Sequence, residues 1–200
     1  NRFVLAGYKL VQTWEGFVYH MTCRGSRFAD GAKRNPNGEV FMKNRETDEW
    51  LKQNGRSTRN FIRKWGHFVK HDALMKPIVP PKYDIGLVVK NCSYEMLYEL
   101  EPWCSTIYVS PEHIAGYIGM EQDTTLFNLK DRVRYDSDEV TNDIVVKFDN
   151  REFVPQQFNY ITQLPEIIAD SGEVGELELG IFKITINKLQ TYENKNIHNS

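Results

Sequence analysis

The chain has 200 residues, of which 40% are hydrophobic and 12% aromatic, and this is enough to bury one sizeable core or two small ones. No apolar run approaches the roughly 18 residues that a membrane span needs, so we expect a globular, soluble protein without a span in these residues. The cysteines Cys23, Cys92 and Cys104 have no CxxC spacing, which argues against a disulfide framework and a thiolate zinc site and favours a reducing, cytoplasmic compartment.

Charge is distributed unevenly along the chain, although the net charge is only −2. Residues 1–82 carry 16 Lys and Arg against 7 Asp and Glu, whereas residues 83–200 carry 9 against 20. This asymmetry predicts that the first part faces an anion, such as a nucleotide diphosphate or a nucleic-acid backbone. Two solvated faces of opposite charge are the alternative.

The elements expected before the middle of the chain are short. Alternating apolar residues predict two strands between Lys9 and Met21, and a polar loop follows from Thr22 to Gly38. A short helix is expected at Thr47–Gln53, and Ser57 is a suitable N-cap for a second helix. The buried face of that second helix would carry Phe61, Ile62, Trp65, Phe68 and Val69, and its solvent face Arg59 and Arg63.

A proline-rich junction lies between Lys76 and Lys82, where each proline removes a backbone donor and favours extended chain before it. We place a domain boundary there, with residues 1–76 before it and residues 83–200 after it. Strand Ile85–Lys90, a helix from Ser93 to Leu100 and strand Thr106–Ser110 would then form a β-α-β unit.

The remaining elements follow from apolar spacing and from proline and glycine. Helical turns are expected from Pro111 to Met120, and a strand from Asp143 to Asp149. A helix should begin at Pro155, kink or restart at Pro165 and end at Gly172. The last strand, from Val174 to Leu189, changes its apolar phase at Ile181-Phe182, which predicts a β-bulge or a sharp bend.

Two segments of the first part resemble family-2 glycosyltransferases with the GT-A fold. Residues Ala6–Thr13 and Phe17–His20 resemble an element in which a "G-[YF]-K" motif leads through a second apolar stretch to a "V-x-H" end, and Phe61–Gly66 resembles the "F-x-x-K-W-G" helix that follows it in many of these enzymes. The resemblance implies an α/β fold class: the C-terminal part of a GT-A-like domain in residues 1–76, followed by a small mixed α/β domain.

This resemblance implies transfer of a sugar from a nucleotide-diphosphate donor to an acceptor hydroxyl. In the family, the strand-end histidine commonly completes the coordination of a divalent ion that an upstream D-x-D pair also holds, which places His20 at the metal. Mn²⁺ or Mg²⁺ would neutralise the charge on the departing diphosphate, and an imidazole ligand favours Mn²⁺. The D-x-D pair and the base would precede Asn1, so this fragment should be inactive alone. Alternatively, His20 only ends a strand and hydrogen-bonds the backbone.

A loop with hydroxyl and guanidinium groups follows the histidine and could wrap a diphosphate, because Arg binds phosphate oxygens bidentately and Gly25 lets backbone N–H groups approach. A solvated basic loop is the alternative. The candidate donor-binding residues of this loop are Thr22, Arg24, Ser26 and Arg27.

The second predicted helix supplies further candidates. Lys64 could reach the donor phosphates or extend its stem over the surface, and we expect Trp65 in the core. His67 and His71 have the i, i+4 spacing of metal ligands, but Phe68 stands where an HExxH motif has Glu, so we expect both histidines at the surface.

The second part of the chain resembles the accessory region appended to some virus-encoded glycosyltransferases, at Tyr83–Val109, Glu121–Thr125 and Glu178–Phe182. Its acidic residues alternate with apolar ones, so we interpret Glu176 and Glu178 as the solvent face of a sheet rather than as a catalytic pair.

Two other functions stay open beside the transferase. A non-catalytic module could bind nucleic acid through basic residues of the first part, namely Arg24, Arg27, Arg59 and Arg63, although no nucleic-acid fold signature is present. The acidic second part could instead be a protein-interaction domain, which is compatible with a transferase.

Overall fold

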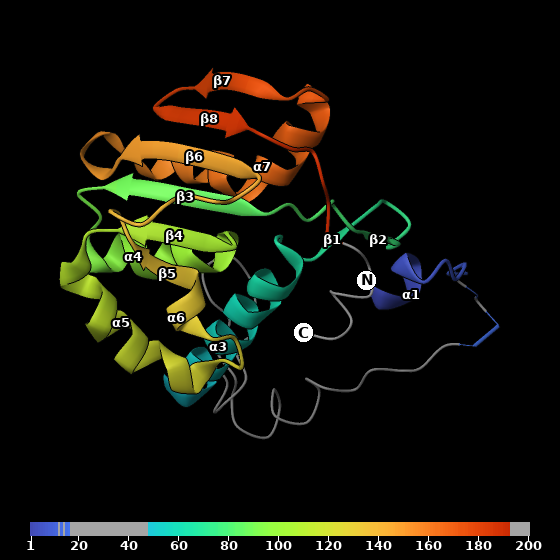
Figure 1. The fold of residues 1–200 in the computed structure, drawn as a ribbon. Coiled ribbons are helices and arrows are strands. Elements are labelled where there is room, and N and C mark those ends of the chain that lie inside the picture. The colour runs from blue at the N-terminus through green and yellow to red at the C-terminus, as the bar shows by residue number, and fades with distance from the viewer. Residues whose placement is uncertain (12, 14, 17–47, 193–200) are drawn as a thin grey trace.

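The computed structural model describes residues 1–11, 13, 15–16 and 48–192. Within them, the main feature is a six-stranded sheet with helices packed against it (Figure 1). The strands of this sheet are β3 (Ile85–Lys90), β4 (Thr106–Val109), β5 (Val133–Tyr135), β6 (Ile144–Asp149), β7 (Gly175–Leu179) and β8 (Phe182–Ile186). The expected α/β class is therefore confirmed, whereas the finer assignment to a GT-A-like domain stays a prediction.

The strand order is β5-β4-β3-β6-β8-β7. Strands β5, β4, β3 and β6 run parallel, and β8 is antiparallel to both β6 and β7. The chain leaves β3 toward β4 on one side, and leaves β6 toward β8 and β7 on the other. The sheet therefore has a topological switch point between β3 and β6, the place where open α/β sheets form their ligand crevices.

The β-α-β unit predicted after the proline junction is present. Helix α4 (Tyr94–Leu100) joins β3 to β4, and the Ser93 hydroxyl caps it by accepting a hydrogen bond from the backbone N–H of Met96 at 3.2 Å. The chain then turns through a 3-10 segment, Glu101–Trp103, before entering β4.

Helices α5 (Ile114–Glu121) and α6 (Leu129–Arg132) connect β4 to β5. The 3-10 turn Pro111–His113 precedes α5, so the helical turns expected from Pro111 onward are confirmed. Strand β5 is an edge strand of only three residues, and no apolar alternation in the sequence predicted it.

The helices pack against one face of the sheet. Leu87 pairs in register with Ile107 and Val146, and Val146 pairs with Ile184, so these side chains point to the same face, where all are buried. The opposite face is partly covered by residues 136–143, which return the chain from β5 to β6.

Asn142 anchors that returning segment over the sheet. Its Oδ1 accepts a hydrogen bond from the Tyr108 hydroxyl at 3.0 Å, and its Nδ2 donates to Asp84 Oδ1 at 2.7 Å. A Cβ atom on Gly86 would lie 2.3 Å from Asn142 Oδ1, so the close approach requires glycine at this position.

Helix α7 (Phe158–Ser171) follows β6 and a 3-10 turn at Pro155–Gln157. Pro165 lies inside this helix without dividing it, so the helix does not restart there, and the kink expected as the alternative stays a prediction. Gly172 ends the helix with a φ of +64°, which confirms the predicted stop.

The single long strand expected at the end of the chain is two strands. Leu179 pairs with Phe182, and the two residues between them, Gly180 and Ile181, form a hairpin turn in which Gly180 has a φ of +61°. The phase shift read from the sequence therefore marks a reversal of direction. Glu176 and Glu178 are exposed on β7, which confirms their placement on the solvent face.

Before the junction, one helix replaces the two that were expected. Helix α3 runs unbroken over Asp48–Trp65, so Ser57 lies in its interior and does not cap it. Trp65 is buried as predicted, but Phe68 and Val69 lie beyond the helix end and are 46% and 70% exposed. Gly66, with a φ of +79°, ends the helix before these two residues can continue its apolar face.

The prediction that Arg59 and Arg63 face solvent is wrong, because they are 8% and 1% exposed. Both side chains point at carboxylates from the second part of the chain. Arg63 donates to Glu101 Oε2 through Nε at 2.9 Å and Nη2 at 2.7 Å, and Arg59 Nη2 donates to Glu121 Oε2 at 3.2 Å. Buried ion pairs thus attach α3 to the six-stranded sheet and its helices, which lie in residues 83–192 and are called here the sheet domain.

A small hairpin leads into the proline junction: β1 (Lys70–His71) lies before the junction and β2 (Pro77–Ile78) within it, and the two strands pair with each other in a sheet of their own. The division into modules at residues 1–76 and 83–200 stays a prediction. Helix α1 (Arg2–Leu5) is a single short helix at the start of the described residues. Among the described residues, no helix is long and apolar enough to cross a membrane.

Candidate functional site

One of the sequence-predicted site residues, Lys64, lies in the described part of the chain. It sits in the last turn of α3 and is partly exposed. The proposed metal ligand and the loop residues after it fall outside the described residues; they are His20, Thr22, Arg24, Ser26 and Arg27. The candidate site is therefore built around Lys64.

The "G-Y-K" motif ends α1 rather than beginning a strand. Gly7 has a φ of +79°, and its N–H donates to the carbonyl oxygen of Val4 at 2.9 Å, while the N–H of Tyr8 donates to that of Phe3 at 3.0 Å. These two bonds form a Schellman motif, which needs a left-handed residue at the position of Gly7. Residues 9–11 form no strand and are exposed, so the first expected strand is wrong over these residues.

A hollow of about 660 Å³ lies between α1, the last turn of α3 and the small hairpin. Tyr8 packs edge-on against Phe3 with ring centroids 5.9 Å apart, which connects the motif to the wall of the hollow. Of the two segments that resemble glycosyltransferases, the second lines the hollow with Phe61, Lys64 and Trp65, and the first reaches it only through the contact of Tyr8 with Phe3. The basic and aromatic residues that line the hollow include Arg2, Phe3, Phe61, Lys64, Trp65 and His71.

Cations converge on this hollow. Partial burial lowers the pKa of Lys64 because it disfavours the charged ammonium group, and the nearby positive charge of Arg2 lowers it further by repulsion. Lys70 also lines the hollow but forms an ion pair with Glu166 of α7. An anion bound between Arg2 and Lys64 would relieve the repulsion that their proximity creates.

The end of α3 that carries Lys64 is fixed by Lys82. The Lys82 Nζ donates to the carbonyl oxygens of Arg63 at 2.9 Å and Lys64 at 2.8 Å, so it satisfies backbone acceptors that a helix end leaves without partners. Burial, with Arg132 and Lys64 adding to it, lowers the pKa of Lys82 to about 8. The position of Lys64 is thereby set by the sheet domain as well as by its own helix.

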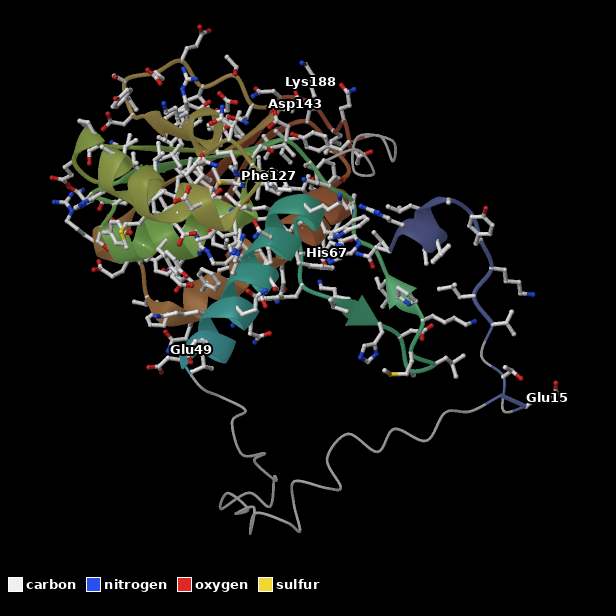
Figure 2. The ribbon with its side chains drawn as sticks, turned by 90° about the horizontal axis from the view of Figure 1, so that it is seen from below. Glu15, Glu49, His67, Phe127, Asp143 and Lys188 are labelled. Atoms are coloured by element: carbon white, nitrogen blue, oxygen red, sulfur yellow. The ribbon has the colours of Figure 1, made fainter. Side chains whose placement is uncertain are left out.

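The two histidines are separated by the structure. His67 is 0% exposed just beyond the end of α3 (Figure 2), which makes the surface prediction wrong for it, whereas His71 is exposed in β1 as expected. The Nδ1 of His67 hydrogen-bonds the carbonyl oxygen of Phe68, so the proton is on Nδ1, and Nε2 has no partner among the described residues. Burial lowers the pKa of His67, which keeps the ring neutral.

The described residues offer no other reactive constellation. No group of three or more His, Cys, Asp or Glu among them comes together in a way that could hold a metal ion. Burial raises the pKa of the Cys92 thiol to about 12 and also raises that of Cys104, so neither is a thiolate at neutral pH.

Sequence reasoning missed Arg2 and Lys70 as parts of the site. The family resemblance pointed to Lys64 because a motif surrounds it, whereas Arg2 stands outside any motif and Lys70 follows the helix. Only the fold brings residues 2, 64 and 70 to one surface.

Comparisons of the chain with protein-family models, with curated proteins and with solved structures gave no match.

Proposed function

We propose that the chain is the C-terminal part of a family-2-like glycosyltransferase, which transfers a sugar from a nucleotide-diphosphate donor to an acceptor hydroxyl with Mn²⁺ or Mg²⁺. The observation that supports this proposal is the hollow, because the second segment that resembles the family lines it with Phe61, Lys64 and Trp65, and Tyr8 of the first segment packs against Phe3 in its wall. Its walls combine aromatic side chains with converging cations, a combination suited to a ligand with a planar base and a phosphate group.

Arg2 and Lys64 would bind the diphosphate. Charge accumulates on this group when the glycosidic bond breaks, and preorganised cations stabilise that charge more strongly in the transition state than in the ground state. Phe3 and Phe61 line the hollow, where an aromatic ring would stack on a nucleobase, and stacking of this kind contributes about 1–3 kcal/mol per base.

The metal rests on the resemblance alone. The described residues contain no cluster that fits a divalent ion, and His20 lies outside them, so we derive no catalytic step through the ion. By the resemblance, His20 together with the upstream acidic pair would bind the ion, and Thr22, Arg24, Ser26 and Arg27 would bind the same phosphates.

The first experiment measures binding of uridine, guanosine and adenosine diphosphate to the 200-residue chain by calorimetry, with and without Mn²⁺. We expect saturable, Mn²⁺-dependent binding of one of these nucleotides. Lys64→Gln should weaken it about tenfold, the usual effect of losing one charge-assisted hydrogen bond. The matched control is Lys52→Gln, an exposed lysine three turns earlier on the same helix.

The metal assignment is tested by His20→Ala in the same assay. A raised Mn²⁺ requirement at unchanged melting temperature supports a ligand role, and superimposable Mn²⁺ titrations would refute it. In the enzyme extended upstream, loss of this group should slow turnover about 30-fold to 1000-fold.

The nucleic-acid alternative loses two of its four arginines, because Arg59 and Arg63 are buried and paired with carboxylates. Tight binding of a single-stranded oligonucleotide with a steep salt dependence, and no response to nucleoside diphosphates, would nevertheless favour that module over the transferase.

A further inference from the structure

The face of the large sheet that carries no helices becomes basic toward the carboxyl ends of its parallel strands. Register places Val88 of β3, Lys147 of β6, Lys183 of β8 and Glu178 of β7 in one row across this face. The next row contains Lys90, which pairs with Asp149. The three lysines on this face, called here the lysine triad, are Lys90, Lys147 and Lys183.

Two members of the lysine triad oppose each other directly. Lys147 and Lys183 are cross-strand partners, and partners on one face have Cβ atoms only about 5 Å apart, so their charges repel. On its other side, Lys183 Nζ lies 3.8 Å from Glu178 Oε1. Both of these side chains are more than 70% exposed, so this contact offsets little of the repulsion between Lys147 and Lys183. Neither Lys90 nor Lys147 has an ion pair within the described ranges.

The triad borders a hollow of about 350 Å³ whose apolar lining includes Val88 and Ile181. This hollow lies beside the carboxyl ends of β3 and β6, at the switch point described above. The loops that follow these two strands are tied together there, because Asn91 Nδ2 donates to both carboxylate oxygens of Asp149 at 3.0 and 2.9 Å, and Asn150 Nδ2 donates to the Asn91 carbonyl oxygen at 3.2 Å.

Two carboxylates also face this hollow and must be counted. Asp149 already accepts hydrogen bonds from the Arg151 side chain, with Nη2 at 2.7 Å from Oδ2, so its charge is largely offset. Glu152 also lines the hollow and forms no salt bridge with the described residues, and its single negative charge is smaller than the positive charge of the three lysines. The net charge of the residues that line the hollow is therefore positive.

We propose that the lysine triad binds the phosphate group of a small organic phosphate, with the organic part resting on Val88 and Ile181. Three ammonium groups around one concave surface can donate hydrogen bonds to the several acceptor oxygens of a phosphate. A bound dianion would attract both Lys147 and Lys183 and so offset the repulsion between them. A volume of about 350 Å³ suits a ligand the size of a mononucleotide or sugar phosphate rather than a polymer. This site is separate from the hollow at Lys64 and does not depend on the proposed transferase.

The test is calorimetric titration of the 200-residue chain with adenosine monophosphate, glucose 6-phosphate and inorganic pyrophosphate. We expect one-to-one binding of at least one of these, weakened about tenfold in Lys147→Gln and in Lys183→Gln. The matched control is Lys188→Gln, an exposed lysine near the same sheet that pairs with Asp143 at 3.1 Å outside the hollow (Figure 2). Lys64→Gln should also leave this binding intact, so the two proposals fail independently.

Thermal unfolding provides a second measurement without ligand. Lys147→Gln removes the repulsion between Lys147 and Lys183 and should raise the melting temperature by about 1–3 °C. If Lys147 only supported the fold, the same substitution would lower the melting temperature. The proposal is overturned if none of the three phosphates binds saturably, or if Lys188→Gln weakens binding as much as Lys147→Gln. Binding of a 12-nucleotide DNA strand more than about 100-fold tighter than adenosine monophosphate would also overturn it in favour of a nucleic-acid backbone site.

Discussion

Replacing Glu101 with Gln should destabilise the chain and release α3 from the sheet domain. Glu101 is 0% exposed, and besides the two bonds from Arg63 its carboxylate accepts one from Arg132 Nε at 2.5 Å and one from the Tyr117 hydroxyl at 2.9 Å. The glutamine side chain keeps the shape of the site but leaves buried guanidinium groups without their countercharge. Breaking a buried ion pair on one side in this way costs about 3–5 kcal/mol.

The pKa of Glu101 gives an independent magnitude. Burial alone would raise this pKa, but Arg132 and Arg63 outweigh burial and lower it from the ordinary 4.5 to about 2. A difference of that size corresponds to about 3 kcal/mol of stability, of the same order as the cost of breaking the pair. Because the folded-state pKa is the lower one, this stability is complete above pH 4.5 and is lost as the pH falls from 4.5 toward 2.

The assay is urea unfolding of wild type, Glu101→Gln and Glu99→Gln, an exposed glutamate on α4, between pH 3 and pH 7. We expect the stability difference between wild type and Glu101→Gln to be largest at pH 7 and to shrink with acid, while Glu99→Gln follows wild type. Hydrogen exchange should show α3 losing protection before β3 and β6 do. A Glu101→Gln protein that is as stable as wild type at pH 7, with α3 fully protected, would refute the assignment of this network as the attachment of α3.

Three further outcomes follow from the packing. Gly86→Ala should cost about 1–3 kcal/mol, because the new methyl group meets Asn142, and Asn142→Ala in the same chain should recover part of that loss in a thermal melt. Gly7→Ala places a side chain at a φ of +79° and should weaken nucleotide binding in the hollow at Lys64 while leaving the melting temperature of the sheet domain unchanged. His67→Gln should flatten the decline in stability below pH 6.5, since the unfolded chain takes up a proton there that buried His67 does not; a pH profile of stability parallel to that of wild type would contradict this reasoning.

Local signals sufficed for most of the second part of the chain. Strand β3 has the predicted bounds Ile85–Lys90, because a continuous apolar run bounded by polar residues permits no other buried element of that length. Ser93 and Gly172 act at helix ends as their side chains and backbone freedom require. The hairpin at Gly180 was visible as a phase change but not as a reversal, since alternation alone does not record the direction of the chain.

The errors in the first part have a different origin. Amphipathicity distinguishes polar from apolar positions, and it cannot tell a charge that meets water from one that meets a distant countercharge. Arg59 and Arg63 share a helix face with buried Ile62, and the carboxylates that pair with them follow 38 residues after Arg63, at Glu101, and 62 residues after Arg59, at Glu121. The assignments that depend on His20 and the loop after it stay predictions, because they rest on a resemblance and lie outside the described residues.

Ion pairs inside the molecule neutralise part of the opposite charge carried by the two parts of the chain. Arg59 and Arg63 from the basic part neutralise Glu101 and Glu121 from the acidic part, so these charges hold the two parts together and are withdrawn from any external anion. Lys64 is the next residue along the helix from Arg63, and one position turns its side chain by about 100° away from the buried network, toward the hollow. The same helix therefore uses one face for attachment and the adjoining face for a ligand. Any change that loosens the attachment should consequently weaken ligand binding at Lys64, even though Glu101 is absent from the residues that line that hollow.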